Sequence, residues 1–317
     1  MSSTHPQVSI VIPVFNEAGS LPELLQRLAA VADELAPTEI LLVNDGSSDG
    51  SWPLLRAAAA ADPRFRVLDL NRNYGQHAAV FAGLEASRGE IVVTLDADLQ
   101  NPPEEIPRLV AKMREGYDVV GTIRENRQDG AFRRFASKMV NRLTRAITGC
   151  VLSDYGCMLR AYRRPIVEAM CNSREISSFI PVLAEMYAGP VAEITVGHAA
   201  RQQGESKYRF WHLVRLFLDL TTSFTLAPLR VAMVGGFLLS GLSFLAALVL
   251  IGGRLVMGTH WAVSGVFTLF SLVFVLLGAL LFALGLLGEY VGRIYLQVRG
   301  RPRFIVRESI GPEGKEP

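Results

Sequence analysis

The sequence predicts an α/β protein with a mostly parallel sheet, followed by two helices that span a membrane. Over roughly the first 125 residues, short apolar runs alternate with segments of helical periodicity, a pattern typical of parallel strands joined by crossover helices. Near the C-terminus, two long stretches contain almost no charge. With 317 residues and 50% hydrophobic content, the chain can form one large domain with an apolar appendage.

Each predicted strand is a short apolar run, and each predicted helix shows apolar residues three and four apart. Strands are predicted at residues 8–15, 39–44, 66–70, 90–95, 118–122, 158–162 and 192–196. Helices are predicted at residues 21–35, 52–61, 76–86, 104–115, 132–148 and 177–187. Pro53 falls in the first turn of the second helix, where its missing N–H is tolerated.

Residues typical of binding loops directly follow the first four predicted strands. They are residues 13–17, Asp45, residues 71–77, and the pair Asp96 and Asp98. In open parallel sheets, ligands bind beyond the carboxyl ends of the strands. The chain has neither a GxGxxG nor a GxxxxGK[ST] motif, which argues against dinucleotide and P-loop sites. A metal ion is then the obvious means of holding a diphosphate.

Asp96 and Asp98 are the strongest candidates for metal ligands. They stand two residues apart at the end of the apolar run 91–93, and residues i and i+2 of a strand lie on one face. Both carboxylates could therefore converge on one hard divalent cation, which would neutralise a departing diphosphate. The alternative is a solvated turn, in which aspartate is common.

Charge and cysteine content exclude other classes of protein. The net charge of +2 is too small to suggest a nucleic-acid partner, and the three cysteines form no CxxC pair. The first seven residues are polar and do not resemble a secretory signal peptide. These features predict a protein of a reducing compartment.

Two apolar stretches, residues 231–253 and 255–288, are each long enough to cross the roughly 30 Å hydrocarbon core. The alternative is a pair of buried core helices. Arginines flank the pair on the outer sides, and the positive-inside rule then places both termini in the cytoplasm. The predicted organisation is a cytoplasmic domain at 1–208, interfacial helices at 209–229, two transmembrane helices at 230–290 and a basic cytoplasmic tail at 291–317.

Three motifs carry a resemblance to a known family: VIPVFNE at 11–17, NDGSSDGS at 44–51 and DADLQNPP at 96–103. Together they resemble family 2 glycosyltransferases, in the branch that glycosylates polyprenyl phosphates. One departure is Asn44, where many relatives carry aspartate. Further motifs, at 71–77, 116–122, 154–164 and 204–208, resemble members that transfer 4-deoxy-4-formamido-L-arabinose.

This resemblance implies a Rossmann-like, GT-A type domain and an inverting, metal-dependent transfer. The donor would be UDP-4-deoxy-4-formamido-L-arabinose, the acceptor undecaprenyl phosphate, and the cofactor Mg²⁺ or Mn²⁺ bound by Asp98. It further implies a homotetramer in the bacterial inner membrane. Its product would serve lipid A modification, which gives resistance to polymyxin and cationic peptides.

The resemblance also implies roles for individual residues. The nucleotide-sugar would contact Pro13, Asn16, Glu17, Asp45, Gly75, Gln76, Asp96, Ala97 and Asp98. The acceptor phosphate would contact Arg124, Arg133, Ser137, Arg160 and Lys207. Asp154 stands at the position of the family's proposed catalytic base, and it would act together with Asp98.

Three alternative functions remain open at this point. The first is a related transferase that uses UDP-glucose or GDP-mannose. The second is a processive polysaccharide synthase, although the chain lacks a QxxRW motif and has few membrane spans. The third is a non-catalytic membrane scaffold or translocase subunit with a vestigial domain, which would not need the acids Asp45, Asp96, Asp98 and Asp154.

Overall fold

The computed structural model describes residues 5–35, 37–124, 152, 156–173, 179–197, 226–257 and 265–311. The chain forms two compact units. One comprises Met1–Arg209 together with Arg301–Pro317, and the other comprises Phe210–Gly300.

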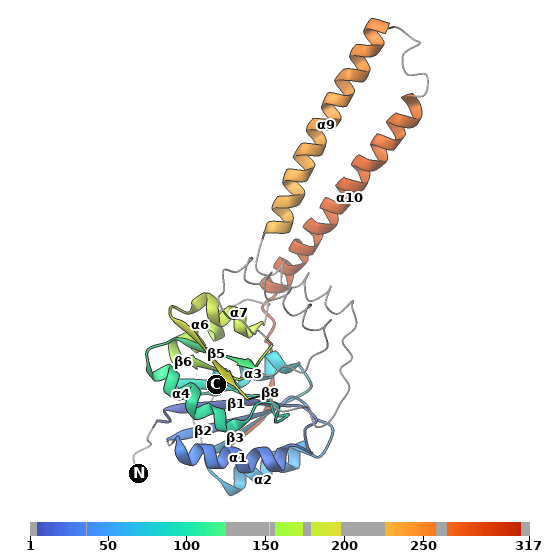
Figure 1. Ribbon diagram of the computed structural model, residues 1–317. Coiled ribbons are helices and arrows are strands. Elements are labelled where there is room, and N and C mark those ends of the chain that lie inside the picture. The colour runs from blue at the N-terminus through green and yellow to red at the C-terminus, as the bar shows by residue number, and fades with distance from the viewer. Residues whose placement is uncertain are drawn as a thin grey trace. The chain divides into compact units, whose positions relative to one another are not determined.

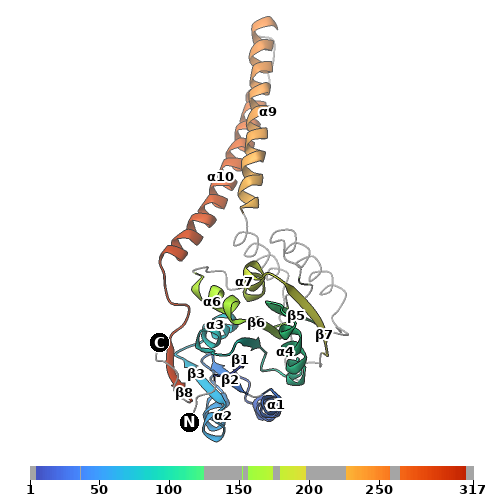
Figure 2. The same ribbon diagram turned by 90° about the vertical axis from the view of Figure 1, so that its left-hand side faces the viewer.

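The first unit is built on one mixed sheet (Figures 1 and 2), whose strand order is β7-β5-β6-β4-β1-β2-β3-β8. The strands are β1 (Val8–Val14), β2 (Thr38–Asn44), β3 (Phe65–Leu70), β4 (Ile91–Thr94), β5 (Val119–Arg124), β6 (Arg160–Arg163), β7 (Val191–Val196) and β8 (Val306–Ile310). β6 runs antiparallel to β4 and β5, and β8 runs antiparallel to β3. The remaining neighbours are parallel.

Helices cover both faces of this sheet (Figure 1). One face carries α1 (Leu21–Glu34), α2 (Ser51–Ala61) and α4 (Ile106–Arg114), which follows a short 3-10 turn at Pro103–Glu105. The other carries α3 (Gln76–Ala86), α6 (Arg164–Asn172) and α7 (Ile180–Tyr187). All residues of β1, β2 and β3 are consequently buried, as expected for strands covered on both sides.

The seven predicted strands are present, with ends that differ by one or two residues. The predicted helix 76–86 matches α3 in full, whereas the segment 104–115 is divided into the 3-10 turn and α4. The predicted helix 132–148 lies outside the described residues. Sequence analysis missed α6, although Pro165 in its first turn is a typical helix start.

The second unit contains the long apolar helices α9 (Ala227–Met257) and α10 (Gly265–Val298). Two segments, Ala227–Met257 and Leu272–Val298, are long and apolar enough to cross a membrane. The alternative of two core helices requires buried side chains, but Phe237 is 80% exposed and Leu255 is 81% exposed. The two helices extend beyond the predicted membrane region 230–290, since α9 begins at Ala227 and α10 ends at Val298.

The segment predicted as a basic tail, residues 291–317, has a different structure. α10 continues through it to Val298, and β8 then joins the sheet of the first unit beside β3 (Figure 2). The edge of β3 would otherwise expose unpaired backbone groups. Residues 301–311 are therefore part of the folded domain.

Gly83 sets how closely α3 approaches the sheet. A Cβ at this position would lie 2.2 Å from Val11 Cγ1 and 3.2 Å from Val43 Cγ2. Alanine normally stabilises a helix by about 0.5–1 kcal/mol over glycine, but overpacking here costs about 1–3 kcal/mol. We therefore expect Gly83→Ala to lower the thermal midpoint of the full-length protein in detergent.

Gly19→Ala is the matched control, since a Cβ at Gly19 meets no atom within 4 Å. We expect its thermal midpoint to stay near that of the wild type. Equal midpoints for the two variants would contradict the close packing of α3 on β1 and β2.

Candidate active site

A crevice is expected where β1 and β4 separate. β1 pairs with β2 as far as Val14↔Asn44, but it pairs with β4 only as far as Val11↔Thr94. The last bond on that side runs from Leu95 N–H to the Val11 carbonyl, at 3.0 Å. Successive strands add on one side of β1 up to β3, and β4 then lies on its other side. Such a switch point is where open α/β sheets bind ligands.

Pro13 fits this separation. Gln7 and Val11 direct their carbonyls toward β4, and Pro13 continues this alternation. Since β4 has already ended at Thr94, the missing N–H of Pro13 removes no ladder bond.

The loops after β1 and β2 are bonded to each other. Asn16, at φ 57°, donates its N–H to Ser47 Oγ at 3.0 Å and accepts the Ser48 N–H on Oδ1 at 2.8 Å. The Glu17 N–H donates to Ser51 Oγ at 3.0 Å. Asn16 and Glu17, both predicted to bind the donor, thus lie in a loop held by the serine-rich segment that follows Asp45.

Asp45 joins the second loop to the third. Its side chain is buried, and its two carboxylate oxygens accept the N–H groups of Tyr74 and Gly75 at 2.7 and 2.9 Å. Burial raises the pKa of Asp45 above its usual value, although the two backbone hydrogen bonds oppose this shift. Gly75 has φ 93°, which strongly favours glycine.

Gly46 brings the second and third loops into backbone contact. Its φ is +66°, and a Cβ would lie only 2.6 Å from the Arg72 carbonyl carbon and the Asn73 nitrogen. Glycine is required here for both reasons. The motif at 44–51 is therefore also explained by the packing of neighbouring loops.

The two candidate metal ligands follow β4, as predicted, but the chain turns there and does not continue in strand conformation. β4 ends at Thr94, and Leu99 has φ 60°. Asp98 accepts the Gln100 N–H at 3.1 Å, and Asp96 accepts a bond from Gln76 Nε2 at 2.5 Å. Strand alternation therefore does not align the two carboxylates, but both acids are partly exposed at the predicted edge of the sheet.

Carboxylates on this turn suit a hard cation, which prefers oxygen ligands. Among the described residues, no group of three or more His, Cys, Asp or Glu side chains could hold a metal ion. A cation beside Asp98 would therefore complete its coordination with water or with phosphate oxygens of a ligand, as Mg²⁺ commonly does. Ala97, between the two acids, is 4% exposed.

Two of the predicted acceptor residues can be placed. Arg124 is the last residue of β5. Arg160 opposes Thr94 at the same edge of the sheet, is 1% exposed, and donates from Nε to the Cys157 carbonyl at 2.9 Å. The other predicted residues of this group, and the predicted base, lie outside the described part of the chain: Arg133, Ser137, Asp154 and Lys207.

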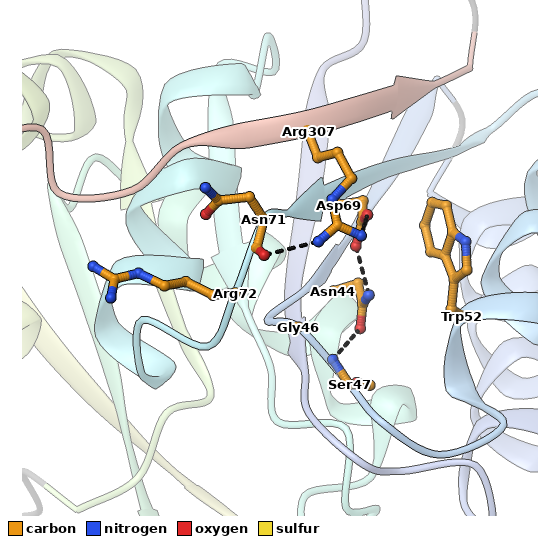
Figure 3. Close-up of a pocket in the computed structure, with 8 residues that line it drawn as sticks. All are labelled: Asn44, Gly46, Ser47, Trp52, Asp69, Asn71, Arg72 and Arg307. Atoms are coloured by element: carbon orange, nitrogen blue, oxygen red, sulfur yellow. Dashed lines mark hydrogen bonds and ion pairs between the residues drawn. The ribbon is translucent and has the colours of Figure 1, made fainter.

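A small polar pocket of about 160 Å³ lies beside the second and third loops (Figure 3). It is lined by Asn44, Gly46, Ser47, Trp52, Asp69, Asn71, Arg72 and Arg307. Sequence analysis missed Asp69 and Arg307. The sequence signal for this pair was Asp69 itself, an acid inside the mainly apolar segment 65–70. A buried carboxylate requires a partner, but the sequence does not say that the partner is Arg307.

Asn44 is explained by its contact with Asp69. Asn44 Nδ2 donates to Asp69 Oδ1 at 2.7 Å, and Asn44 Oδ1 accepts the Ser47 N–H at 3.2 Å. Both side chains are buried. An ionised aspartate at position 44 would have no hydrogen to donate to Asp69, whereas the amide of asparagine donates one at any pH.

The comparisons with known proteins agree with this geometry. The model of the family "Glycosyl transferase family 2" matches residues 9–171. The chain belongs to glycosyl transferase family 2. This transferase is also 52% identical over 315 residues to a protein of Aeromonas hydrophila subsp. hydrophila, with 98% of this chain and 97% of that protein covered. That relative is named undecaprenyl-phosphate 4-deoxy-4-formamido-L-arabinose transferase.

Solved structures share the fold of this family 2 transferase. Glucosyl-3-phosphoglycerate synthase from Mycobacterium tuberculosis, in complex with phosphoglyceric acid, matches with TM-score 0.51 and 20% identity over 69% of this chain and 80% of that chain. The same enzyme, in complex with Mn²⁺ and UDP-glucose, matches with TM-score 0.52 and 18% identity over 69% and 79%. The predicted GT-A type domain is confirmed.

The contact between Asn44 and Asp69 can be tested with Asn44→Asp. The new carboxylate replaces a donor that lies 2.7 Å from Asp69 Oδ1, and losing a buried hydrogen bond to a charged group costs about 1.5–3 kcal/mol. Repulsion between the two carboxylates of the folded variant favours protonation of one of them, which raises the pKa of the pair. The loss of stability is therefore full at pH 8, where both groups are ionised. It becomes smaller as the pH falls, because one group then takes up a proton. We expect a larger loss of thermal midpoint at pH 8 than at pH 5.

Asn73→Asp is the control, because it makes the same chemical change at an exposed position. We expect little change in its midpoint at either pH. An Asn44→Asp protein as stable as the wild type at pH 8 would show that Asn44 and Asp69 are not in contact.

Proposed function

We propose that this transferase moves 4-deoxy-4-formamido-L-arabinose from UDP to undecaprenyl phosphate, with inversion at the anomeric carbon. The observation that carries the proposal is the 52% identity, over nearly the whole of both chains, to a relative with that name. The loops beyond β1 to β4 supply a site of suitable chemistry. The glucosyl-3-phosphoglycerate synthase with the same fold, whose structure holds Mn²⁺ and UDP-glucose, supports a UDP-sugar as the donor.

The donor is proposed to occupy the crevice between the loops after β1 and β4. Its nucleotide would contact the residues predicted for that role: Pro13, Asn16, Glu17, Asp45, Gly75, Gln76, Asp96, Ala97 and Asp98. Asp98 would hold Mg²⁺ or Mn²⁺, and the bound cation would supply Lewis-acid neutralisation of the leaving UDP. The Gln76–Asp96 bond would orient Asp96 toward the nucleotide.

The acceptor oxygen needs little activation. The second pKa of a phosphate monoester is about 6, so this oxygen is mostly ionised at neutral pH. The chain's main task is then to bring two anions together in line. The proposed phosphate contacts are Arg124, Arg133, Ser137, Arg160 and Lys207, with Asp154 orienting the acceptor or stabilising positive charge at the anomeric carbon.

The lipid acceptor cannot leave the bilayer, and α9 and α10 are apolar enough to hold the enzyme there. We propose a bacterial inner-membrane location with the catalytic domain and both termini in the cytoplasm. The arginines that flank the helices on that side support this orientation. The proposed assembly is a homotetramer, and the proposed role is lipid A modification that confers resistance to cationic peptides.

A donor panel tests this proposal. Full-length protein in detergent is incubated with a short polyprenyl phosphate and, separately, UDP-4-deoxy-4-formamido-L-arabinose, UDP-glucose or GDP-mannose. We expect a glycolipid product with the first donor, at a kcat/KM at least about tenfold above the others. Preference for either hexose donor would favour the related hexosyltransferase, and no product with any donor would favour the scaffold.

The metal role is tested separately with Asp98→Ala. We expect kcat to fall about 100-fold or more, since a group that stabilises developing charge is lost, while the thermal midpoint is unchanged. Glu34→Ala removes an exposed acid from the end of α1 and is the control for loss of charge. Normal turnover in EDTA would contradict the metal role.

A further inference from the structure

We propose that Arg307 is a positioning residue for the donor site. Through it, the C-terminal segment 301–311 holds the loop after β3 in the shape that binds the donor nucleotide. This inference rests on the proposed function, because it takes residues 71–76 to be part of the donor site. Arg307 acts on the donor through this loop and does not touch the reacting atoms.

The C-terminal segment is anchored to the domain on several sides. The Arg303 guanidinium lies over the Phe81 ring of α3, 4.3 Å from its centroid, and also donates to the carbonyl of Ser173 after α6. Phe304 packs against the apolar clusters beneath α3. β8 then pairs with β3 from Leu70↔Val306 to Val67↔Ile310, with an irregularity between Asp69 and Leu70.

Asn71, the first residue after β3, has both backbone polar groups bonded to this segment. Its N–H donates to the Ile305 carbonyl at 3.1 Å, and its carbonyl accepts from Arg307 Nη2 at 2.8 Å. At the far end of the same loop, Asp45 accepts the N–H groups of Tyr74 and Gly75. Residues 71–75 are therefore fixed at one end by Asp45, the buried acid that follows β2, and at the other by the C-terminal segment.

Arg307 reaches the second loop as well (Figure 3). Its Nη1 lies 3.3 Å from Asp69 Oδ2, and the other oxygen of Asp69 accepts from Asn44. Asn44 in turn accepts the Ser47 N–H. A single guanidinium thus bonds directly to the loop after β3 and, through two buried side chains, to the loop after β2.

The geometry separates a positioning role from a purely structural one. The Arg307 side chain is 60% exposed, whereas that of Asp69 is 4% exposed. The guanidinium lies largely in water, where an ion pair contributes little to global stability, and the buried Asp69 keeps its hydrogen bond from Asn44 without it. Loss of Arg307 should therefore act mainly on the loops. A lysine could keep one of the two contacts, but it lacks the planar fork needed for both.

The test compares Arg307→Ala, Arg307→Lys and the control Arg301→Ala in the full-length protein. Arg301 carries the same charge in the same segment and is exposed. Three quantities are measured: hydrogen exchange of the peptide covering residues 71–75 without ligand, the Kd for UDP with Mn²⁺, and the KM values for donor and acceptor.

For Arg307→Ala we expect faster exchange in residues 71–75 and about a tenfold rise in UDP Kd and donor KM, with acceptor KM and thermal midpoint nearly unchanged. Arg307→Lys should be intermediate, and Arg301→Ala should match the wild type. Unchanged exchange and donor KM in Arg307→Ala, or equal losses in donor and acceptor KM with a lowered midpoint, would overturn the inference. A wild-type protein that binds no UDP would overturn the proposed function together with it.

Discussion

The separation of β1 from β4 is the constraint on which the rest of the site depends. The ladder between these strands ends with the bond from Leu95 N–H to the Val11 carbonyl, while β1 continues beside β2 to Val14. This difference in length gives Pro13 a place without a lost hydrogen bond. The proposed donor crevice is a consequence of strand order and strand length.

The loops around this edge are held by polar groups of the protein itself. Asp45 accepts two backbone N–H groups of the third loop, and the serines after it bind the first loop. Sites of this kind are preorganised, because the shape of the loops does not depend on the ligand. Asp45 therefore has a structural task, whatever it contacts in the donor. Arg307 extends the same network from the C-terminal segment.

Local patterns predicted the sheet well, since buried parallel strands are continuous apolar runs and α3 has clear boundaries from Gln76 to Ala86. β8 was missed because its partner β3 lies more than 200 residues earlier, and a five-residue strand after a long apolar helix has no distinctive period. Asp96 and Asp98 were placed at the correct edge of the sheet, but the turn at Leu99 was not foreseen. Contacts such as Asn44–Asp69 depend on strand register and could not be inferred from spacing.

The most direct test of the account is the position of the metal ion relative to the edge where β1 and β4 separate. Crystals of the full-length protein grown with UDP and Mn²⁺ would locate manganese by its anomalous scattering. We predict a single strong peak within coordination distance of an Asp98 carboxylate oxygen and of the UDP phosphates. A peak elsewhere in the domain, or UDP bound with no manganese near Asp98, would contradict it.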